Sequence, residues 1–253
     1  MDFVKEMRTK AKSLQKRLVL PEGTEPRTVR AARILVDEEL AASVTLLGKE
    51  SEVQKVAVEE GVDLEGVVVI NPAASHLVEK YANEYYELRK HKGMTPEQAK
   101  IDIIAPLRWG AMMVRLGDAD AMVGGAENTT ADVLRAGLAI IGTTPGSKTA
   151  SSCFVMQTGD AAWGVDGALI FSDCAVVPDP TAEQLAEIAM SAAQSCREFL
   201  DTEPAVALLS FSTKGSGGDH PDVQKVRAAL ELVKAKETGL LIDGDLQADA
   251  ALV

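Results

Sequence analysis

The segment best suited to chemistry joins an apolar run to a helix through two glycines. It reads Met122-Val-Gly-Gly-Ala-Glu-Asn-Thr-Thr-Ala-Asp-Val-Leu-Arg135. Glycines let the backbone approach a ligand closely, and Asn128, Thr129 or Thr130 can cap a helix whose free N–H groups face an anion. The segment lacks the spacing of a P-loop and the GxGxxG fingerprint of a dinucleotide site. It therefore predicts a phosphate cradle, with a plain strand-to-helix turn as the alternative.

Cations occur at the end of this segment and in an earlier part of the chain. Helix side chains lean toward the helix N-terminus, so Arg135 can reach an anion held at the cap, unless it only forms a surface pair with Asp132. The segment Tyr86-Glu-Leu-Arg-Lys-His-Lys-Gly93 places four potentially cationic side chains in succession, among them Arg89. Such a cluster attracts phosphates, but cations in the last turn of a helix also stabilise the negative end of its dipole.

A third candidate follows the apolar run Ala205–Leu209 and reads Phe211-Ser-Thr-Lys-Gly-Ser-Gly-Gly218. Open α/β sheets bind ligands at the carboxyl ends of their strands, where Lys214 supplies a mobile positive charge. The alternative is a flexible surface loop. The hydroxyl groups near Lys214 add several donors for an anion.

Metal and nucleophile chemistry have weaker support. A Mg²⁺ site brings several carboxylates together, and such a group is present at Asp243, Asp245 and Asp249. Aspartates, however, more often cap turns and the first turns of helices. The three histidines are widely separated and no GxSxG sequence surrounds a serine, so neither a zinc protease nor a serine hydrolase is indicated. The three cysteines, an odd number without paired spacing, support neither a disulfide framework nor a CxxC metal site.

The elements that position these residues alternate between amphipathic stretches and short apolar runs, which predicts βαβ units. Most runs are continuously apolar, as in a sheet covered on both faces. The predicted strands are Arg17–Leu20, Ser43–Leu47, Val67–Ile70, Ala121–Val123, Ser152–Met156, Leu169–Ser172, Ala205–Phe211 and Leu240–Ile242.

Helix signals fall between these strands. Thr95, Pro96 and Gln98 predict a helix start whose end we place at Gly117, and Thr181 with Gln184 predicts a second capping box. The polar stretch 142–148 predicts a junction between a first α/β domain, 1–145, and a second, 146–253.

Composition restricts the class of protein. A length of 253 residues, with 46% hydrophobic and 25% charged residues, describes one or two globular domains. The net charge of −12 argues against binding to nucleic acid or to an anionic membrane surface. The charged N-terminus lacks an apolar signal region, no run is long enough to span a membrane, and the cysteine usage suits a reducing compartment. We therefore expect a cytoplasmic protein.

In these segments the chain resembles the phosphate acetyltransferases (phosphotransacetylases) and phosphate butyryltransferases. The resemblance spans nearly the whole chain in the family's order. It is carried by Leu20-Pro-Glu-Gly-Thr-Glu-Pro-Arg-Thr28, Tyr86–Gly93, Gly124–Arg135, Asp166–Asp173, Leu208–Ser216 and Ile242–Val253.

The resemblance implies two α/β domains with a cleft between them, similar to isocitrate and isopropylmalate dehydrogenases, and a homodimer. It implies reversible acetyl transfer between coenzyme A and phosphate in acetate metabolism, with no cofactor and no metal. A carboxylate base takes the thiol proton, and the thiolate attacks acetyl phosphate. Arg89 and Arg135 match the family's phosphate-site arginines, and Ser212, Thr213, Lys214 and Gly215 match a substrate loop.

The chain also departs from the family pattern. Asn128 stands where many members carry histidine, and Ala136 where proline is common, which leaves the acyl preference open. Members continue beyond the point that matches Val253, so we expect an incomplete second domain, a catalytic base beyond Val253 and weak or no activity of this form. The alternatives are a phosphate butyryltransferase, a non-catalytic fragment that binds coenzyme A or phosphate, and an NAD- and metal-dependent 2-hydroxyacid dehydrogenase.

Overall fold

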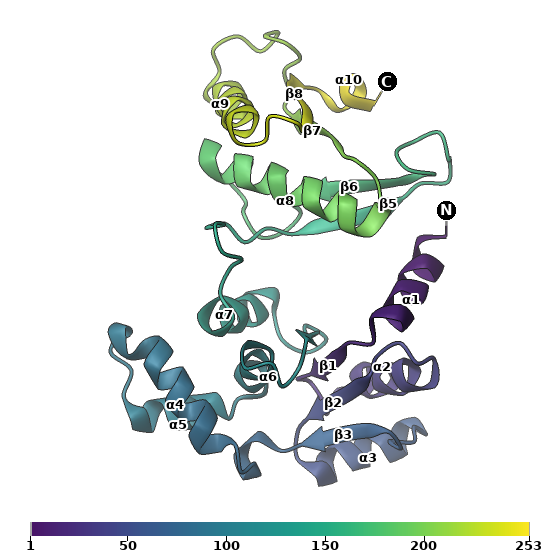
Figure 1. Ribbon diagram of the computed structural model, residues 1–253, viewed down its shortest axis with the longest axis vertical. Coiled ribbons are helices and arrows are strands. Elements are labelled where there is room, and N and C mark those ends of the chain that lie inside the picture. Colours follow the sequence, from purple (N-terminus) through teal and green to yellow (C-terminus); the bar gives the residue numbers. More distant parts are fainter. Residues whose placement is uncertain (1, 253) are drawn as a thin grey trace. The chain divides into compact units, whose positions relative to one another are not determined.

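The computed structural model describes residues 2–252 and divides the chain into two compact units (Figure 1). One unit is Lys5–Gly142, and the other is Thr143–Val253 together with Met1–Val4. Each unit has a hydrophobic core of its own. Within residues 2–252, no helix has the length and apolar character needed to cross a bilayer.

A four-stranded parallel sheet of order β3-β2-β1-β4 organises the unit Lys5–Gly142. Its strands are β1 (Arg17–Leu20), β2 (Ser43–Leu47), β3 (Val67–Ile70) and β4 (Ala121–Met122). Successive residues point to opposite faces, so Val19 and Leu47 belong to one core cluster while Leu20 and Leu46 belong to another. Both faces of the sheet are thus covered, as the apolar runs predict.

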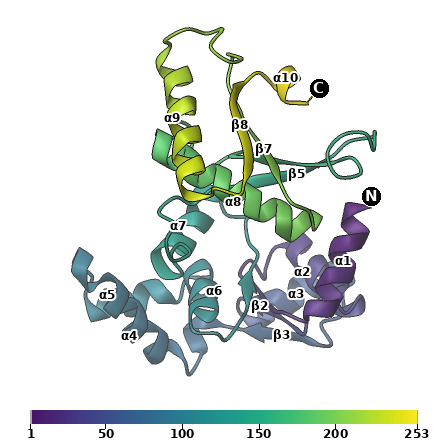
Figure 2. The same cartoon turned by 45° about the horizontal axis from the view of Figure 1, so that its top comes forward.

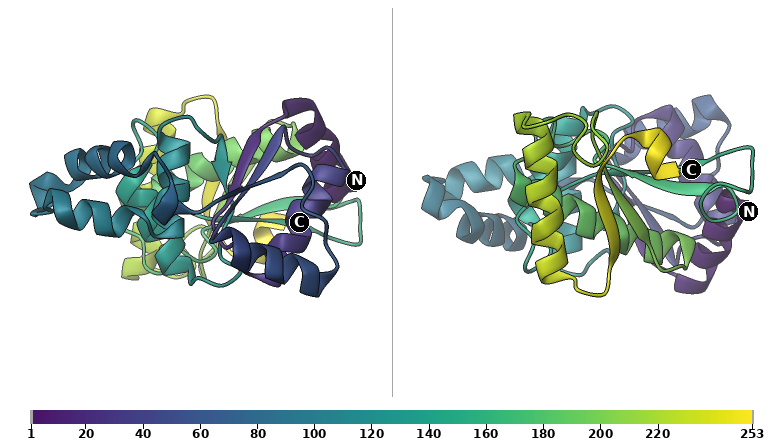
Figure 3. Two further views of the ribbon diagram at one scale, coloured as in Figure 1. Left: turned by 90° about the horizontal axis from the view of Figure 1, so that it is seen from below. Right: turned by 90° about the horizontal axis from the view of Figure 1, so that it is seen from above.

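Helices form the two covering layers (Figure 3, left). One core cluster joins the sheet to α2 and α3, and the other joins it to α4, α5 and α6. The helices are α1 (Phe3–Leu14), α2 (Pro26–Asp37), α3 (Glu50–Glu60), α4 (Val78–Arg89), α5 (Pro96–Ile103), α6 (Pro106–Arg115) and α7 (Thr130–Ile140), with short 3-10 helices at Pro72–Ala74 and Lys90–Lys92.

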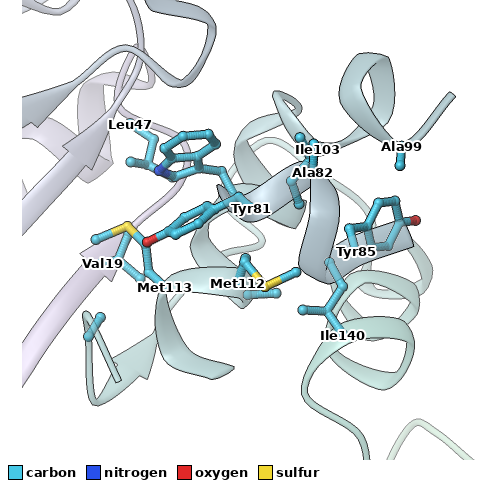
Figure 4. Packing of buried hydrophobic residues seen from close by; sticks show 13 residues of the cluster. Val19, Leu47, Tyr81, Ala82, Tyr85, Ala99, Ile103, Met112, Met113 and Ile140 are labelled. Carbon is cyan, nitrogen blue, oxygen red and sulfur yellow. The ribbon is translucent and has the colours of Figure 1, made fainter. Parts of the chain in front are cut away.

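Tyr81 and Trp109 lie at the centre of the larger cluster, with ring centroids 4.5 Å apart. Figure 4 shows the Tyr81 ring close to Met113. The Tyr81 hydroxyl donates a hydrogen bond of 2.5 Å to Asp118. The aromatic ring therefore fills the core while its polar end is satisfied by a carboxylate.

The prediction of a single helix from Pro96 to Gly117 is wrong, because α5 ends at Ile103 and a separate helix, α6, begins at Pro106. Thr95 caps α5 as predicted, accepting a hydrogen bond from the Gln98 N–H at 3.2 Å. Ala105 is extended (ψ 129°) and Pro106 occupies the first turn of α6. Proline disfavours a helical residue before it and lacks the N–H that a continuous helix requires, so it ends one helix and begins the next.

The unit Thr143–Val253 contains two small sheets and three helices within its described residues (Figure 2). Its elements are β5 (Cys153–Gln157), β6 (Ala168–Ser172), α8 (Ala182–Leu200), β7 (Ala205–Leu209), α9 (Pro221–Lys236), β8 (Leu241–Leu246) and α10 (Ala248–Leu252). The parallel strands β7 and β8 pack with α8 and α9 around Leu208, Leu230 and Ile242. Thr181 and Gln184 form the predicted reciprocal capping box at the start of α8.

Strands β5 and β6 depart from the expected βαβ pattern because they pair antiparallel, with Phe154 opposite Phe171. The connecting segment 158–167 contains no helix, and a crossover to a parallel strand needs a dozen or more residues. Phe154, Met156 and Phe171 are exposed, so this hairpin is not covered on both faces within the described chain. Apolar content alone did not distinguish it from a buried parallel pair.

Candidate functional site

The predicted phosphate cradle is a real anion nest, and the anion in it is the carboxylate of Glu22. The N–H groups of Gly125 and Ala126 donate to Oε2, both at 2.8 Å. The N–H groups of Glu127 and Asn128 donate to Oε1 at 3.0 and 2.7 Å, and the Asn128 side-chain amide donates to the same oxygen at 2.8 Å. Gly125 has φ +111°, a conformation that favours glycine, which explains one of the two glycines.

Glu22 lies two residues beyond the end of β1 and is only 4% exposed. Burial by itself opposes ionisation, but the hydrogen bonds from Asn128, Glu127 and Ala126 outweigh it and lower the pKa of Glu22 to about 2. The carboxylate is therefore charged and fully occupied. These four backbone amides are therefore bound to an anion that the protein itself supplies, and binding of a ligand's phosphate near Asn128, Thr129 and Thr130 stays a prediction.

Helix α7 begins immediately after this nest. Thr129 is its N-cap, since its hydroxyl accepts from the Asp132 N–H at 3.2 Å and donates to the Asp132 carboxylate at 2.7 Å. Arg135 pairs with Asp132 at 2.6 Å and is 69% exposed. These bonds, first from Thr129 and then from Arg135, lower the pKa of Asp132. Thr130 is exposed at the first turn.

The basic segment after α4 adopts the predicted helix end. Lys90–Lys92 form a 3-10 turn and Gly93 closes it with φ +83°. Lys90 pairs with Glu87, whose carboxylate raises the pKa of Lys90. The half-buried Arg89 guanidinium makes no hydrogen bond or ion pair with any residue from 2 to 252. A positive pocket combining Arg89 with Arg135 stays a prediction.

The serine-threonine-lysine-glycine loop lies in the other unit and is bound to the end of β8. Lys214 pairs with Asp243 and donates to the Gly244 carbonyl at 3.0 Å. The Thr213 hydroxyl accepts from the Gln247 N–H at 3.0 Å. Ser212 is 0% exposed, and its hydroxyl accepts from the Gly217 N–H at 2.9 Å. Ser212 therefore holds the loop together rather than facing solvent.

The aspartates that motivated a metal site have other partners. Asp245 is buried, accepts from the Arg227 guanidinium at 3.0 Å, and has its pKa lowered by Ser212 and then Arg227. Asp243 pairs with Lys214, which lowers the pKa of Asp243. Across residues 2–252, no group of three histidines, cysteines or acids could hold a metal ion. The dehydrogenase alternative thereby loses the feature that suggested it.

A hollow of about 440 Å³ lies at the carboxyl ends of β1, β2 and β3. Its lining includes Glu22, Gly48, Asn71, Leu107 and Asn128. Parallel α/β sheets commonly bind ligands at this edge. The hollow adjoins the Glu22 nest and lies wholly within the unit Lys5–Gly142.

Sequence reasoning missed Glu22, Arg227 and the role of Asp245. A charged residue two positions after a buried strand was the available signal for Glu22, because an acid at that edge must find donors when it is buried. The pairing of Arg227 with Asp245 joins residues on α9 and β8 and has no local sequence pattern.

Comparison with known proteins shows the family of this chain. Residues 2–253 match the family model described as "Phosphate acetyl/butaryl transferase", and the chain belongs to this family. It is 54% identical over 255 residues to a phosphate acetyltransferase of Treponema pallidum and 46% identical over 253 residues to one of Thermoanaerobacterium thermosaccharolyticum. Each comparison covers 100% of this chain and 76% of the relative.

A solved structure agrees with these relatives. A phosphotransacetylase from Streptococcus pyogenes superposes with a TM-score of 0.91 at 38% identity, covering 99% of this chain and 74% of the other. The resemblance found in the sequence is thus confirmed, as is a mixed α/β fold with a parallel sheet.

Proposed function

We propose that this chain is a phosphate acetyltransferase, which transfers an acetyl group reversibly between coenzyme A and inorganic phosphate. The observation that carries the proposal is the match of the family across residues 2–253, together with relatives of that name at 54% and 46% identity. The substrates are then coenzyme A or acetyl-coenzyme A and phosphate or acetyl phosphate, and no cofactor is needed. A thiolate attacks the acetyl carbonyl while cations neutralise the departing phosphate.

We assign phosphate contacts to Arg89 and Arg135. The free guanidinium of Arg89 and the exposed, weakly held guanidinium of Arg135 support this assignment. Other proposed substrate contacts, carried from the sequence, are Asn128, Thr129, Thr130, Thr213, Lys214 and Gly215. Ser212 keeps only an indirect role, through the loop that it holds. No catalytic base is assigned.

Several features of the family remain proposals for this chain. These are two domains, 1–145 and 146–253, that form a cleft as in isocitrate and isopropylmalate dehydrogenases, assembly as a homodimer, and a cytoplasmic location. The cysteine usage supports the last, since three cysteines without paired spacing suit a reducing compartment. Sedimentation and a crystal structure with bound coenzyme A test the other two.

The test combines turnover with binding. Formation of acetyl-coenzyme A from acetyl phosphate and coenzyme A is followed, and calorimetry measures the binding of each substrate separately. Turnover that requires both substrates supports the proposal, and faster turnover of butyryl phosphate redirects it to butyryl transfer. Binding without turnover indicates a non-catalytic form. Absence of both turnover and binding overturns the proposal.

A further inference from the structure

We propose that Glu22 is a positioning residue for the binding of phosphate in this reaction. By holding the side-chain amide nitrogen of Asn128, it leaves the amide oxygen of Asn128 free to accept a hydrogen bond from the substrate. The proposal rests on the proposed function. It assigns Asn128 the task of recognising a protonated phosphate oxygen, and Glu22 the task of presenting Asn128 for it.

The first step concerns the direction of the Asn128 amide. A carboxylate only accepts hydrogen bonds, so the group that faces Glu22 at 2.8 Å must be the amide nitrogen of Asn128. The amide oxygen then points away from Glu22. Within the described part of the chain, this oxygen has no donor. Asn128 is half-buried and lines the hollow at the sheet edge, so a ligand can reach it.

The second step concerns how firmly the loop is held. Glu22 takes the N–H groups on one side of the loop, while Arg27 donates to the Ala126 carbonyl and pairs with Glu25 at 2.6 Å. The loop is therefore clamped through both its donors and its acceptors. It leads directly into the Thr129 cap, from which α7 projects Arg135.

The third step compares the two ends of the same strand pair. At the amino ends of β1 and β4, Asp120 accepts from the Arg17 backbone at 2.8 Å and from its guanidinium at 2.7 Å. That acid braces two strands with an ordinary ion pair. At the carboxyl ends, Glu22 binds backbone amides and one side-chain amide that lines a hollow. Asp120 is thus a control acid on the same strand pair, and it does not line the hollow.

The fourth step concerns the ligand. An amide oxygen cannot bind an ionised phosphate oxygen, because neither has a proton to share. It can accept from the hydroxyl of a hydrogenphosphate group, which sulfate lacks near neutral pH. The site so built favours phosphate over sulfate, since an unpaired acceptor would lose its solvation without a partner.

The experiment measures binding of inorganic phosphate and of sulfate to the folded chain by calorimetry. For Glu22→Gln, one half of the side chain becomes a donor that opposes the loop N–H groups, so phosphate should bind at least about tenfold more weakly. Asp120→Asn should bind phosphate within about twofold of the original chain. Asn128→Ala should bring phosphate and sulfate affinities within about twofold of each other.

A double variant separates positioning from plain stability. If Glu22 acts through Asn128, then Glu22→Gln should weaken phosphate binding by no more than about twofold when Asn128→Ala is already present. An undiminished effect in that background overturns the proposal. So does unchanged discrimination against sulfate in Asn128→Ala, which remains informative even where Glu22→Gln fails to fold.

The wild-type chain shows which idea has failed. If it binds neither phosphate nor coenzyme A and forms no acetyl-coenzyme A, the proposed function fails and this inference fails with it. If it binds phosphate while Glu22→Gln and Asn128→Ala change nothing, only the positioning role is lost.

Discussion

Asn128 donates two hydrogen bonds to one oxygen of Glu22, from its backbone N–H at 2.7 Å and from its side-chain amide at 2.8 Å. The two residues lie in the segments that follow the neighbouring strands β1 and β4. An internal acid thus occupies the place where the glycine pattern predicts a ligand. The same arrangement makes this end of the unit sensitive to acid.

The first prediction concerns acid stability. The folded pKa of Glu22 is about 2 against an ordinary 4.5, so its contribution is complete above pH 4.5 and is lost as the pH falls through 2. Glu22→Gln should lower the free energy of unfolding by about 3 kcal/mol near neutral pH, and the pH-dependent part should fall to roughly half near pH 3.

Urea unfolding followed by circular dichroism checks this prediction. Glu59→Gln is the control, because Glu59 is an exposed acid whose ion pair with Lys55 is 3.8 Å long. A deficit for Glu22→Gln that stays constant from neutral pH to pH 3 would contradict the assigned ionisation.

The second prediction concerns Arg135. Its exposed pair with Asp132 contributes little, so Arg135→Ala should change the free energy of unfolding by less than about 0.5 kcal/mol. If the guanidinium binds phosphate, acetyl phosphate should bind about tenfold more weakly. Arg8→Ala, which removes another exposed guanidinium paired with Glu38, should leave binding unchanged. Equal binding by all three proteins would return Arg135 to a surface pair.

The third prediction compares two arginines of equal exposure. The side chains of Arg227 and Arg197 are both 34% exposed, but their partners Asp245 and Glu203 are 3% and 86% exposed. Arg227→Gln leaves a buried carboxylate without its cation and should cost about 3 kcal/mol, whereas Arg197→Gln should cost less than about 1 kcal/mol. Comparable midpoints of urea unfolding for the two variants would refute this difference.

The fourth prediction concerns the core. Tyr81→Phe removes the hydroxyl that donates to Asp118, at an expected cost of about 1 to 2 kcal/mol. Tyr86→Phe removes a hydroxyl that makes no hydrogen bond among residues 2–252, and should cost less than about 0.5 kcal/mol. Thermal and urea unfolding of both variants give the comparison. A loss for Tyr81→Phe no larger than that for Tyr86→Phe would contradict the expected contribution of the hydrogen bond to Asp118.

Local signals predicted most of the elements. Arg17–Leu20, Ser43–Leu47 and Val67–Ile70 form strands with the expected bounds, because short apolar runs between turn residues suit a covered parallel sheet. The antiparallel pairing of β5 with β6 was not predictable in this way. Whether two strands pair parallel or antiparallel depends on the segment that connects them rather than on the residues of each strand. Pro106 is the sequence signal for the boundary between α5 and α6, because proline ends a helix before it and can begin the next one.

The candidate site shows the same division between local and distant information. The glycine-rich turn after β4, with N–H groups that face an anion, is predictable because glycine and N–H geometry are local properties. Its occupant was not predictable, since Glu22 lies about a hundred residues earlier and reaches the loop only through strand pairing. Likewise, the sequence predicts a mobile cation at Lys214, but the acid that neutralises it belongs to the next strand of the sheet.

The division into two units distributes the chain's two tryptophans evenly, with Trp109 in Lys5–Gly142 and Trp163 in Thr143–Val253. Trp109 is fully buried against Tyr81, while Trp163 is partly exposed, so their emission maxima should differ. Replacing either indole with phenylalanine leaves a fluorophore that reports on one unit alone. Such a pair of single-tryptophan proteins would reveal whether the units melt together or in succession.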